Sequence, residues 1–259
     1  MLAKQNDIST PEVFAAILGE HFVSTYPHIH AAHVKIIVHR WTRLEVDGKP
    51  HPHSFFRDGA EIRTVEAVAR EGEGISIKSG IEKLLVLKST GSAFYGFHRD
   101  EYTRLPETWD RILSTEVEAE WQWNTFKSLA EVKQKEKIFD QAHTDARKIT
   151  VETFATENSP SVQNTMYKMS EQILEKAQEV QSVSYKLPNK HYFEIGEFDI
   201  CGSDEMMQVK RANTTVADLS WYKGLKNTGK DAEVFAPQSD PNGLIQSTVH
   251  RKGQAKSKL

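Results

Sequence analysis

The stretch Ser114–Trp123, which reads STEVEAEWQW, has the pattern that decides the fold class. Its apolar side chains stand at every second position from Val117 to Trp123, and glutamates and a glutamine alternate with them. Successive side chains of a strand point to opposite faces, so this alternation predicts a strand with one buried and one solvated face. Strands of this kind are typical of antiparallel sheets, and we therefore expect such a sheet here.

Two helices are predicted, each by a capping residue followed by proline. Thr10 and Pro11 start the first, and Ser159 and Pro160 start the second. Apolar residues then recur at helical spacing, at Val13, Phe14, Ile17, Leu18 and Phe22 and at Val162, Met166, Met169, Ile173 and Leu174. Further strands are predicted at residues 33–38, 75–78, 148–154 and 183–187, with turns at 47–48 and 72–74. Because strands and helices come in groups, an antiparallel α+β fold is favoured over a doubly wound parallel sheet.

The composition of the 259 residues excludes several classes of protein. With 33 basic and 36 acidic side chains the formal charge is −3, which argues against a broad basic face for nucleic acid. The single cysteine, Cys201, excludes a disulfide framework and a thiolate zinc site and fits a reducing compartment. No apolar run approaches the roughly 18 residues of a membrane span, and the polar residues 1–6 predict no signal peptide. We expect a soluble intracellular protein.

Two groups of residues have side chains suited to ligand binding. Histidines gather at residues 28–33 and 51–53, but no carboxylate stands at a metalloprotease spacing, which favours solvated or interface histidines over a zinc site. Aromatic residues from Phe94 to Phe97 precede Arg111. Their rings could stack on a flat heterocycle while the arginine grips an imide or carboxylate. The alternative is a packed aromatic core beside a surface arginine.

Two further candidates lie in and after the second predicted helix. Gln163 opens the helix, where free backbone N–H groups either meet a polar ligand or serve only in capping. His191 is a candidate general base or proton carrier with Asn189 beside it as a neutral donor. The alternative for His191 is an ordinary structural histidine in a strand.

The last three residues, Ser257, Lys258 and Leu259, form the tripeptide that the peroxisomal import receptor recognises. They follow a basic stretch, residues 251–256, which we expect to be flexible and accessible. We therefore expect the protein to be imported into the peroxisome.

Several stretches of the chain resemble the urate oxidase (uricase) family, most closely its fungal members. The longest is Leu84–Phe94, continued by Phe97, Tyr102, Leu105 and Arg111. The others are residues 39–43, 47–55, 187–191, 227–230 and 235–244. The resemblance covers residues 3–195 and 218–259. It implies two tandem tunnelling-fold domains, residues 1–73 and 74–259, each an antiparallel sheet backed by helices, in a homotetramer.

The resemblance also implies that urate is oxidised by O2 and water to 5-hydroxyisourate and hydrogen peroxide, without a metal or a cofactor. It implies the following substrate-binding residues: Phe94, Arg111, Val162, Gln163 and Asn189. Phe94 would stack on the purine, Arg111 and Gln163 would grip its polar edge, and the backbone N–H of Val162 would add a hydrogen bond. Asn189 would hold O2 or water above the ring, and His191 would belong to the proton relay.

Two departures from the family affect these expectations. The family has strands before the point that matches residue 3, and they carry a lysine and a threonine of the catalytic relay. We therefore expect an incomplete first domain with an exposed edge strand that favours aggregation. Residues 196–217 interrupt the family's pattern, either as a surface loop or, as we favour, as a retained intron translated in frame.

These departures leave an alternative function open. The chain could be an inactive uricase-like fragment that binds purines at most. A tunnelling-fold enzyme acting on a pterin is a third hypothesis. The motifs at residues 94–111 and 189–191 argue against the pterin enzyme.

Overall fold

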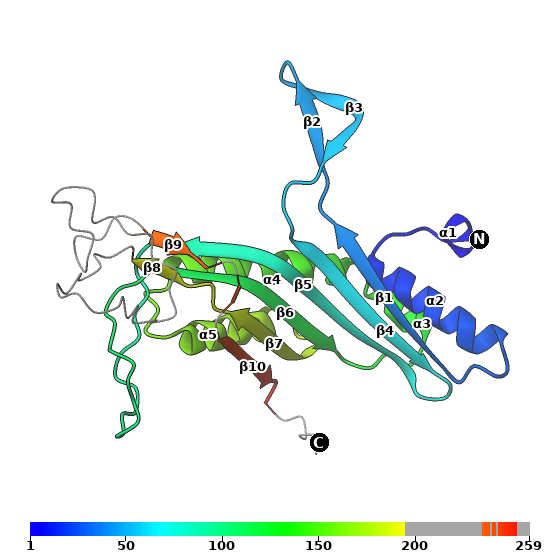
Figure 1. Ribbon diagram of the computed structural model, residues 1–259. Coiled ribbons are helices and arrows are strands. Elements are labelled where there is room, and N and C mark those ends of the chain that lie inside the picture. Colours follow the sequence, from blue (N-terminus) through cyan, green and yellow to red (C-terminus); the bar gives the residue numbers. More distant parts are fainter. Residues whose placement is uncertain (195–234, 239, 242, 253–259) are drawn as a thin grey trace, which may run out of the picture.

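The structure is a computed structural model that describes residues 1–194, 235–238, 240–241 and 243–252 (Figure 1). Its centre is an antiparallel sheet of six strands in the order β1-β4-β5-β6-β7-β10. These strands are β1 (Ala31–His39), β4 (Ile62–Arg70), β5 (Gly74–Lys88), β6 (Leu113–Trp123), β7 (Val180–Pro188) and β10 (Leu244–His250). The antiparallel α+β fold predicted from the sequence is therefore confirmed.

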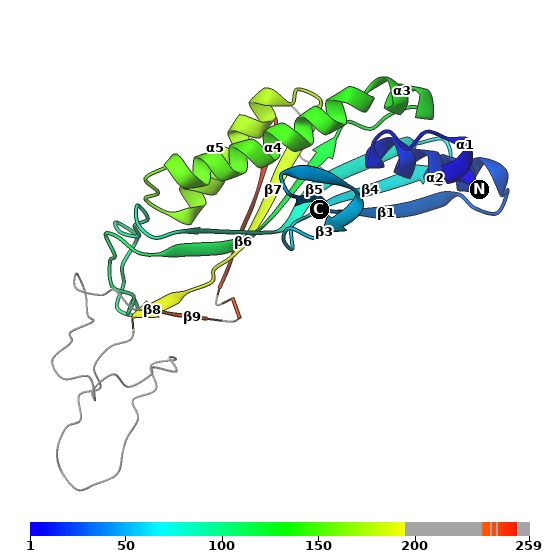
Figure 2. The ribbon, with the colours of Figure 1, turned by 90° about the horizontal axis from the view of Figure 1, so that it is seen from above.

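Helices cover one face of this sheet (Figure 2). The helices are α1 (Leu2–Gln5), α2 (Pro11–Thr25), α3 (Leu129–Gln134), α4 (Glu136–Thr156) and α5 (Val162–Lys176). α2 packs against β1 and β4, whereas α4 packs against β5, and α5 packs against β7 and β10. On the sheet, ion pairs link neighbouring strands, as between Lys78 and the carboxylates of Glu66 and Glu120. The sheet thus has a helix-covered face and a charged face.

Strand β6 has the burial pattern that its sequence predicts. Val117, Ala119, Trp121 and Trp123 are each at most 1% exposed, and the residues between them are partly exposed. The ring of Trp123 meets Phe139 of α4 edge-on, with the ring centroids 4.8 Å apart. Burial of these large rings removes apolar surface from water and stabilises the contact between the sheet and the helices.

Both predicted helix starts have the expected kind of cap. Thr10 Oγ1 accepts a hydrogen bond from a backbone N–H of the first turn at 3.3 Å, and Pro11 is the first residue of α2. The second helix starts later than predicted, because Ser161, and not Ser159, caps α5. Its Oγ accepts from a backbone N–H three residues further on, at 3.2 Å.

Helix α2 buries Val13 and Ile17 of the predicted stripe, but the rest of its buried face differs from the prediction. Phe22 was expected on the buried stripe but is 42% exposed, whereas Ala15 and Ala16 are fully buried. A Cβ at Gly19 would lie 3.1 Å from Cβ of Ala69 in β4, so a larger side chain would not fit there. Small residues therefore line this face because the helix backbone lies close to the sheet.

The strand predicted at residues 148–154 is wrong, because these residues belong to α4. Apolar and β-branched residues such as Ile149 and Val151 suggested a strand over this short window. Over the whole helix the buried residues recur at helical spacing: Phe139, Ala142, Ala146, Thr150, Thr153 and Phe154. This stripe faces the sheet, where Thr150 Oγ1 and Tyr185 Oη of β7 are hydrogen-bonded at 2.6 Å. The helical spacing of apolar residues over the whole of α4 therefore predicts the structure better than the short window at residues 148–154 does.

Two smaller, two-stranded sheets accompany the main sheet. One is a hairpin of β2 (Thr42–Val46) and β3 (Lys49–Phe56), which projects away from the main sheet (Figure 1). Its turn was predicted, and Asp47 and Gly48 there both have positive φ, 52° and 72°. In the other, β8 (Tyr192–Glu194) pairs antiparallel with β9 (Phe235–Pro237), which lies far from it in the chain.

Some predictions stay untested. Residues 196–217 and the targeting residues 257–259 lie outside the described ranges. The division into domains at residues 73 and 74 stays a prediction, although the predicted turn is present there, with Gly72 and Gly74 at positive φ between β4 and β5. β1 is the outermost strand on its side of the described sheet. None of the described helices combines the length and the apolar character needed to cross a membrane.

Arg251 is bound, although it was predicted to belong to a flexible tail. Its Nη2 donates to the carbonyls of Leu174 and Ala177 at 2.6 and 2.9 Å. These carbonyls lie at the C-terminal end of α5, where a cation interacts favourably with the helix dipole. The ordered chain therefore extends into the predicted tail.

Candidate active site

The predicted site residues gather at one end of the main sheet. Phe94 and Arg111 lie in residues 89–112, which connect the end of β5 to the start of β6. Asn189, directly after β7, forms a β-bridge with Thr115 near the start of β6. Because β5 and β7 both pair antiparallel with β6, their C-terminal ends lie where β6 begins. Side chains that are far apart in the sequence therefore meet there.

Arg111 lies over the ring of Phe94, with its Cζ 5.6 Å from the ring centroid. The backbone of Phe94 exchanges two hydrogen bonds with Thr108, of 2.7 and 2.9 Å, which hold the ring in place. Phe97 stacks on Phe94 at a centroid distance of 4.7 Å and an interplanar angle of 16°. Phe97 therefore lies against one face of the Phe94 ring, and the guanidinium of Arg111 lies over the ring as well.

The guanidinium of Arg111 is half-buried and has no carboxylate partner among the described residues. Burial lowers its pKa below the ordinary value, and no acidic group of the described part offsets this effect. Its Nε atom is buried without a hydrogen-bond partner within the same residues. An unsatisfied buried donor costs about 1–3 kcal/mol, and a planar ligand with adjacent acceptors would satisfy it. These features are typical of a binding residue.

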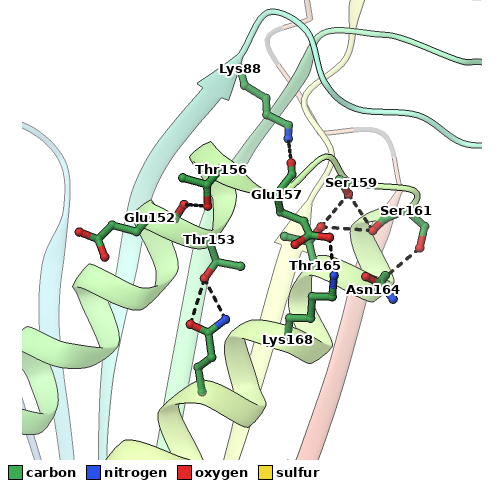
Figure 3. A network of polar contacts seen from close by, with 11 residues as sticks. Lys88, Glu152, Thr153, Thr156, Glu157, Ser159, Ser161, Asn164, Thr165 and Lys168 are labelled. Atoms are coloured by element: carbon green, nitrogen blue, oxygen red, sulfur yellow. Dashed lines mark hydrogen bonds and ion pairs between the residues drawn. The ribbon is translucent and has the colours of Figure 1, made fainter.

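Helix α5 begins beside the loop that carries the aromatic pair (Figure 3). Ser159 ties the two together, because its carbonyl accepts from the N–H of Ala93 at 2.9 Å and its N–H donates to Gly91 at 3.2 Å. Val162 and Gln163 are the first two residues of α5, with the Val162 side chain buried and that of Gln163 exposed. N–H groups in a first turn lack partners inside the helix and favour a polar or anionic ligand.

Asn189 and His191 are both half-buried and follow β7. The N–H of Asn189 and the carbonyl of His191 form backbone hydrogen bonds of 3.0 and 2.9 Å with residues next to β10 and β9. Between them, the N–H of Lys190 donates to the carbonyl of Ser114 in β6 at 2.9 Å. The structure thus places both residues at the same sheet end as Arg111. Their roles in catalysis stay predictions.

Asp110 supports the site but was not singled out by the sequence. Its carboxylate accepts hydrogen bonds from Thr90 Oγ1 at 2.5 Å and from the N–H of Gly91 at 2.8 Å. The bond from Thr90, with further backbone N–H groups, holds the pKa of Asp110 below its ordinary value despite partial desolvation. These bonds close the loop between β5 and β6 directly beside Arg111. Because the partners are 20 and 19 residues away, no local pattern reveals them.

The two histidine groups are arranged in other ways. His51 and His53 stack on each other on β3, with ring centroids 4.7 Å apart. His30 is hydrogen-bonded to Glu71 at 2.7 Å. Across the described ranges, no three His, Cys, Asp or Glu side chains are grouped so that they could hold a metal ion. His30 is a solvated histidine, whereas Nδ1 of His51 is buried, and the preference for solvated or interface histidines over a zinc site stays a prediction.

The antiparallel sheet with helices on one face is the architecture of the tunnelling-fold class, to which the solved uricase structures similar to this chain belong. A family model described as Uricase matches residues 2–68 and 77–246. The chain belongs to the uricase family.

Individual relatives agree with this assignment. Uricase from Aspergillus flavus is 57% identical over 257 residues, which span 99% of this chain and 78% of that protein. Uricase from Emericella nidulans is 58% identical over 256 residues, with the same shares of the two chains. The crystal structure of uricase from Arthrobacter globiformis superposes with a TM-score of 0.75 at 31% identity, covering 98% of this chain and 75% of that one. The resemblance to fungal uricases is therefore confirmed.

Proposed function

We propose that this chain is a urate oxidase that converts urate, O2 and water into 5-hydroxyisourate and hydrogen peroxide. The observation that carries the proposal is the half-buried guanidinium of Arg111, unpaired within the described residues, over the Phe94 ring. Uricases that align with nearly the whole chain support the same reaction.

The proposed binding mode uses both sides of the site. The purine stacks on the ring of Phe94, and Arg111 and Gln163 hold its polar edge. The backbone N–H of Val162 adds a hydrogen bond. Urate is an anion, so both the guanidinium and the positive end of the α5 dipole stabilise it.

The proposed chemistry needs little from the protein beyond position, charge and proton transfer. An electron-rich urate dianion gives two electrons to O2, which takes up two protons and becomes hydrogen peroxide. Water supplies the hydroxyl group of the product. Asn189 holds O2 or water above the ring, and His191 moves protons, because an imidazole ring can both donate and accept one.

Two further parts of the proposal concern the whole protein. It assembles as a homotetramer, as the family resemblance implies, and it enters the peroxisome through Ser257, Lys258 and Leu259. Fusion of residues 251–259 to a fluorescent reporter tests the second part, since the reporter is expected in peroxisomes. Removal of the last three residues is expected to leave it in the cytosol.

The reaction is tested on the purified chain by following the loss of the purine absorbance band of urate together with peroxide formation. We expect one peroxide for each urate consumed, and none from heat-unfolded protein. Urate binding without turnover would contradict the proposal and support a purine-binding function instead. Turnover of a pterin but not of urate would contradict it as well.

A further inference from the structure

Ser159 is a buried residue whose polar groups all take part in hydrogen bonds. It is 1% exposed. Its backbone N–H and carbonyl bind residues 91 and 93, in the loop that leads to Phe94. Its Oγ donates to the carbonyl of Ser161 at 2.9 Å and accepts from Oγ1 of Thr165 at 2.6 Å (Figure 3). Ser159 therefore contacts both the aromatic loop and the start of α5.

Thr165 completes this connection from the helix side. It is 3% exposed and lies in the first turn of α5, two residues after Gln163. Its hydroxyl bonds to Ser159 Oγ, and its backbone N–H donates to the carbonyl of Ser161 at 3.3 Å. The capping residue, the first turn and Ser159 are thereby joined in one buried hydroxyl network. In a buried setting such bonds are geometrically strict, because an unmade one leaves a desolvated hydroxyl.

A second set of contacts holds the same connection from the side of β5 (Figure 3). Lys88 Nζ, at the end of β5, donates to the carbonyl of Glu157 at 2.6 Å. The carboxylate of Glu157 in turn pairs with Lys168 of α5 at 2.5 Å. Residues 157–161 are thus fastened to the sheet and to α5, so the start of α5 cannot shift freely relative to β5.

We propose that Ser159 and Thr165 are positioning residues of the site. Their hydroxyl pair keeps Val162 and Gln163 in register with a ring stacked on Phe94. The inference rests on the proposed function, because it assumes a ligand held by both elements. Phe94 and Gln163 belong to different elements, so their relative position depends on this tertiary contact. Small displacements of binding groups are costly, since a shift of about 1 Å can reduce a rate about 100-fold.

The test compares Thr165→Val with Ser170→Ala. Valine has nearly the same shape as threonine but lacks the hydroxyl that bonds to Ser159. Ser170 lies on the same helix, is fully buried, and donates only within the helix, to the carbonyl of Met166 at 2.9 Å. Both variants remove a buried hydroxyl of α5, but only Thr165→Val removes a hydrogen bond between the helix and Ser159, the residue that binds the aromatic loop.

We expect Thr165→Val to raise the KM for urate and the Kd for xanthine by about tenfold, and Ser170→Ala to change both less than twofold. Thr165→Ser is expected to restore both values, because it returns the hydroxyl donor. Ser159→Ala removes the same hydroxyl pair and keeps the backbone bonds to residues 91 and 93. It is therefore expected to raise both values as Thr165→Val does. The double variant should then be no worse than either single one.

The inference would be overturned if Thr165→Val and Ser170→Ala had the same KM for urate and the same Kd for xanthine. It would also be overturned if Thr165→Ser did not restore these two values. If Thr165→Val does not fold, Ser159→Ala decides by the same comparison. Urate binding measured without O2 separates this inference from the proposed function. If the wild-type protein binds urate without oxidising it, only the proposed function is contradicted. If the wild-type protein does not bind urate at all, both the proposed function and this inference are contradicted.

Discussion

Arg111 is the half-buried cation of the candidate site, and the proposed function assigns to it the binding of an anionic purine. Burial lowers the pKa of its guanidinium, and its Nε has no hydrogen-bond partner among the described residues. A structural arginine would pair with a carboxylate, as Arg147 does with Glu61 at 2.7 Å. The contrast between these two arginines distinguishes a residue that awaits a ligand from one that joins two elements.

Arg111→Ala is expected to weaken urate binding about 100-fold or more, because charge-assisted hydrogen bonds worth about 3 kcal/mol in total are lost. Titration with urate in the absence of O2 measures this. Arg104→Ala is the control, since Arg104 is an exposed arginine of the same loop. Tight binding of xanthine by Arg111→Ala would contradict the assignment.

A charged network that includes Glu61 and Asp58 lies at the foot of the hairpin formed by β2 and β3. Glu61, directly before β4, accepts hydrogen bonds from Arg147 of α4 at 2.7 and 2.9 Å and from Arg40 at 2.7 Å. Arg40 also binds both carboxylate oxygens of Asp58, at 3.1 and 3.0 Å. The charged network therefore links the hairpin, the sheet and α4.

Glu61→Gln is expected to lower the free energy of unfolding at pH 7 by about 1.5–3 kcal/mol. Burial alone would raise the pKa of Glu61, but hydrogen bonds from Arg147 and Arg40 outweigh it and lower the pKa below 4.5. A carboxylate whose pKa is lower in the folded than in the unfolded protein stabilises the fold at pH values above its unfolded pKa. This stabilisation is lost as the pH falls through the folded pKa. The difference from wild type should therefore shrink as the pH falls below about 4.5.

Urea unfolding at a series of pH values measures this difference. Glu152→Gln is the control, because Glu152 is an exposed residue of α4 that pairs only loosely with Lys148, at 3.8 Å. A constant difference between wild type and Glu61→Gln from pH 7 to pH 3 would contradict the role given to the charge.

Across the whole molecule, one buried network joins the helix layer to the sheet. Glu12 of α2 is fully buried and accepts from Arg63 of β4 and from Ser79 of β5, each at 2.7 Å. Ser79 Oγ also accepts from the indole of Trp123 in β6 at 2.9 Å, and Arg63 binds Asp140 of α4 at 2.6 Å. The contacts span two helices and three strands, so the N-terminal part of the chain and the site-bearing part share one core.

Glu12→Ala is expected to destabilise the protein by about 3–5 kcal/mol, since it removes the buried carboxylate to which Arg63 and Ser79 donate and leaves Arg63 only its pair with the more exposed Asp140. Glu12→Gln should cost less, because it keeps a hydrogen-bond acceptor. Chemical denaturation measures both, and Glu20→Ala is the control on the same helix at a partly exposed position. An unfolding midpoint of Glu12→Ala equal to that of Glu20→Ala would contradict this role.

Local patterns predicted those elements whose signal lies within a few residues. The alternation before Trp123 and the cap at Thr10 each depend on neighbouring side chains, and both are confirmed. The prediction of a strand at residues 148–154 was wrong, because a short window cannot distinguish a helix segment rich in β-branched residues from a strand. The prediction that Phe22 is buried was wrong, because the burial of a helix face depends on how closely the helix approaches the sheet.

The sequence by itself determined the fold class, the family and the identity of the candidate site residues, because these follow from local periodicity and recognisable motifs. Only the tertiary structure decided that Arg111 lies over Phe94 with a buried nitrogen that has no hydrogen-bond partner within the described ranges. It also decided that Ser159 connects the aromatic loop to α5. These contacts join residues far apart in the chain, so they exist only once the strands have paired and burial has removed the competing water.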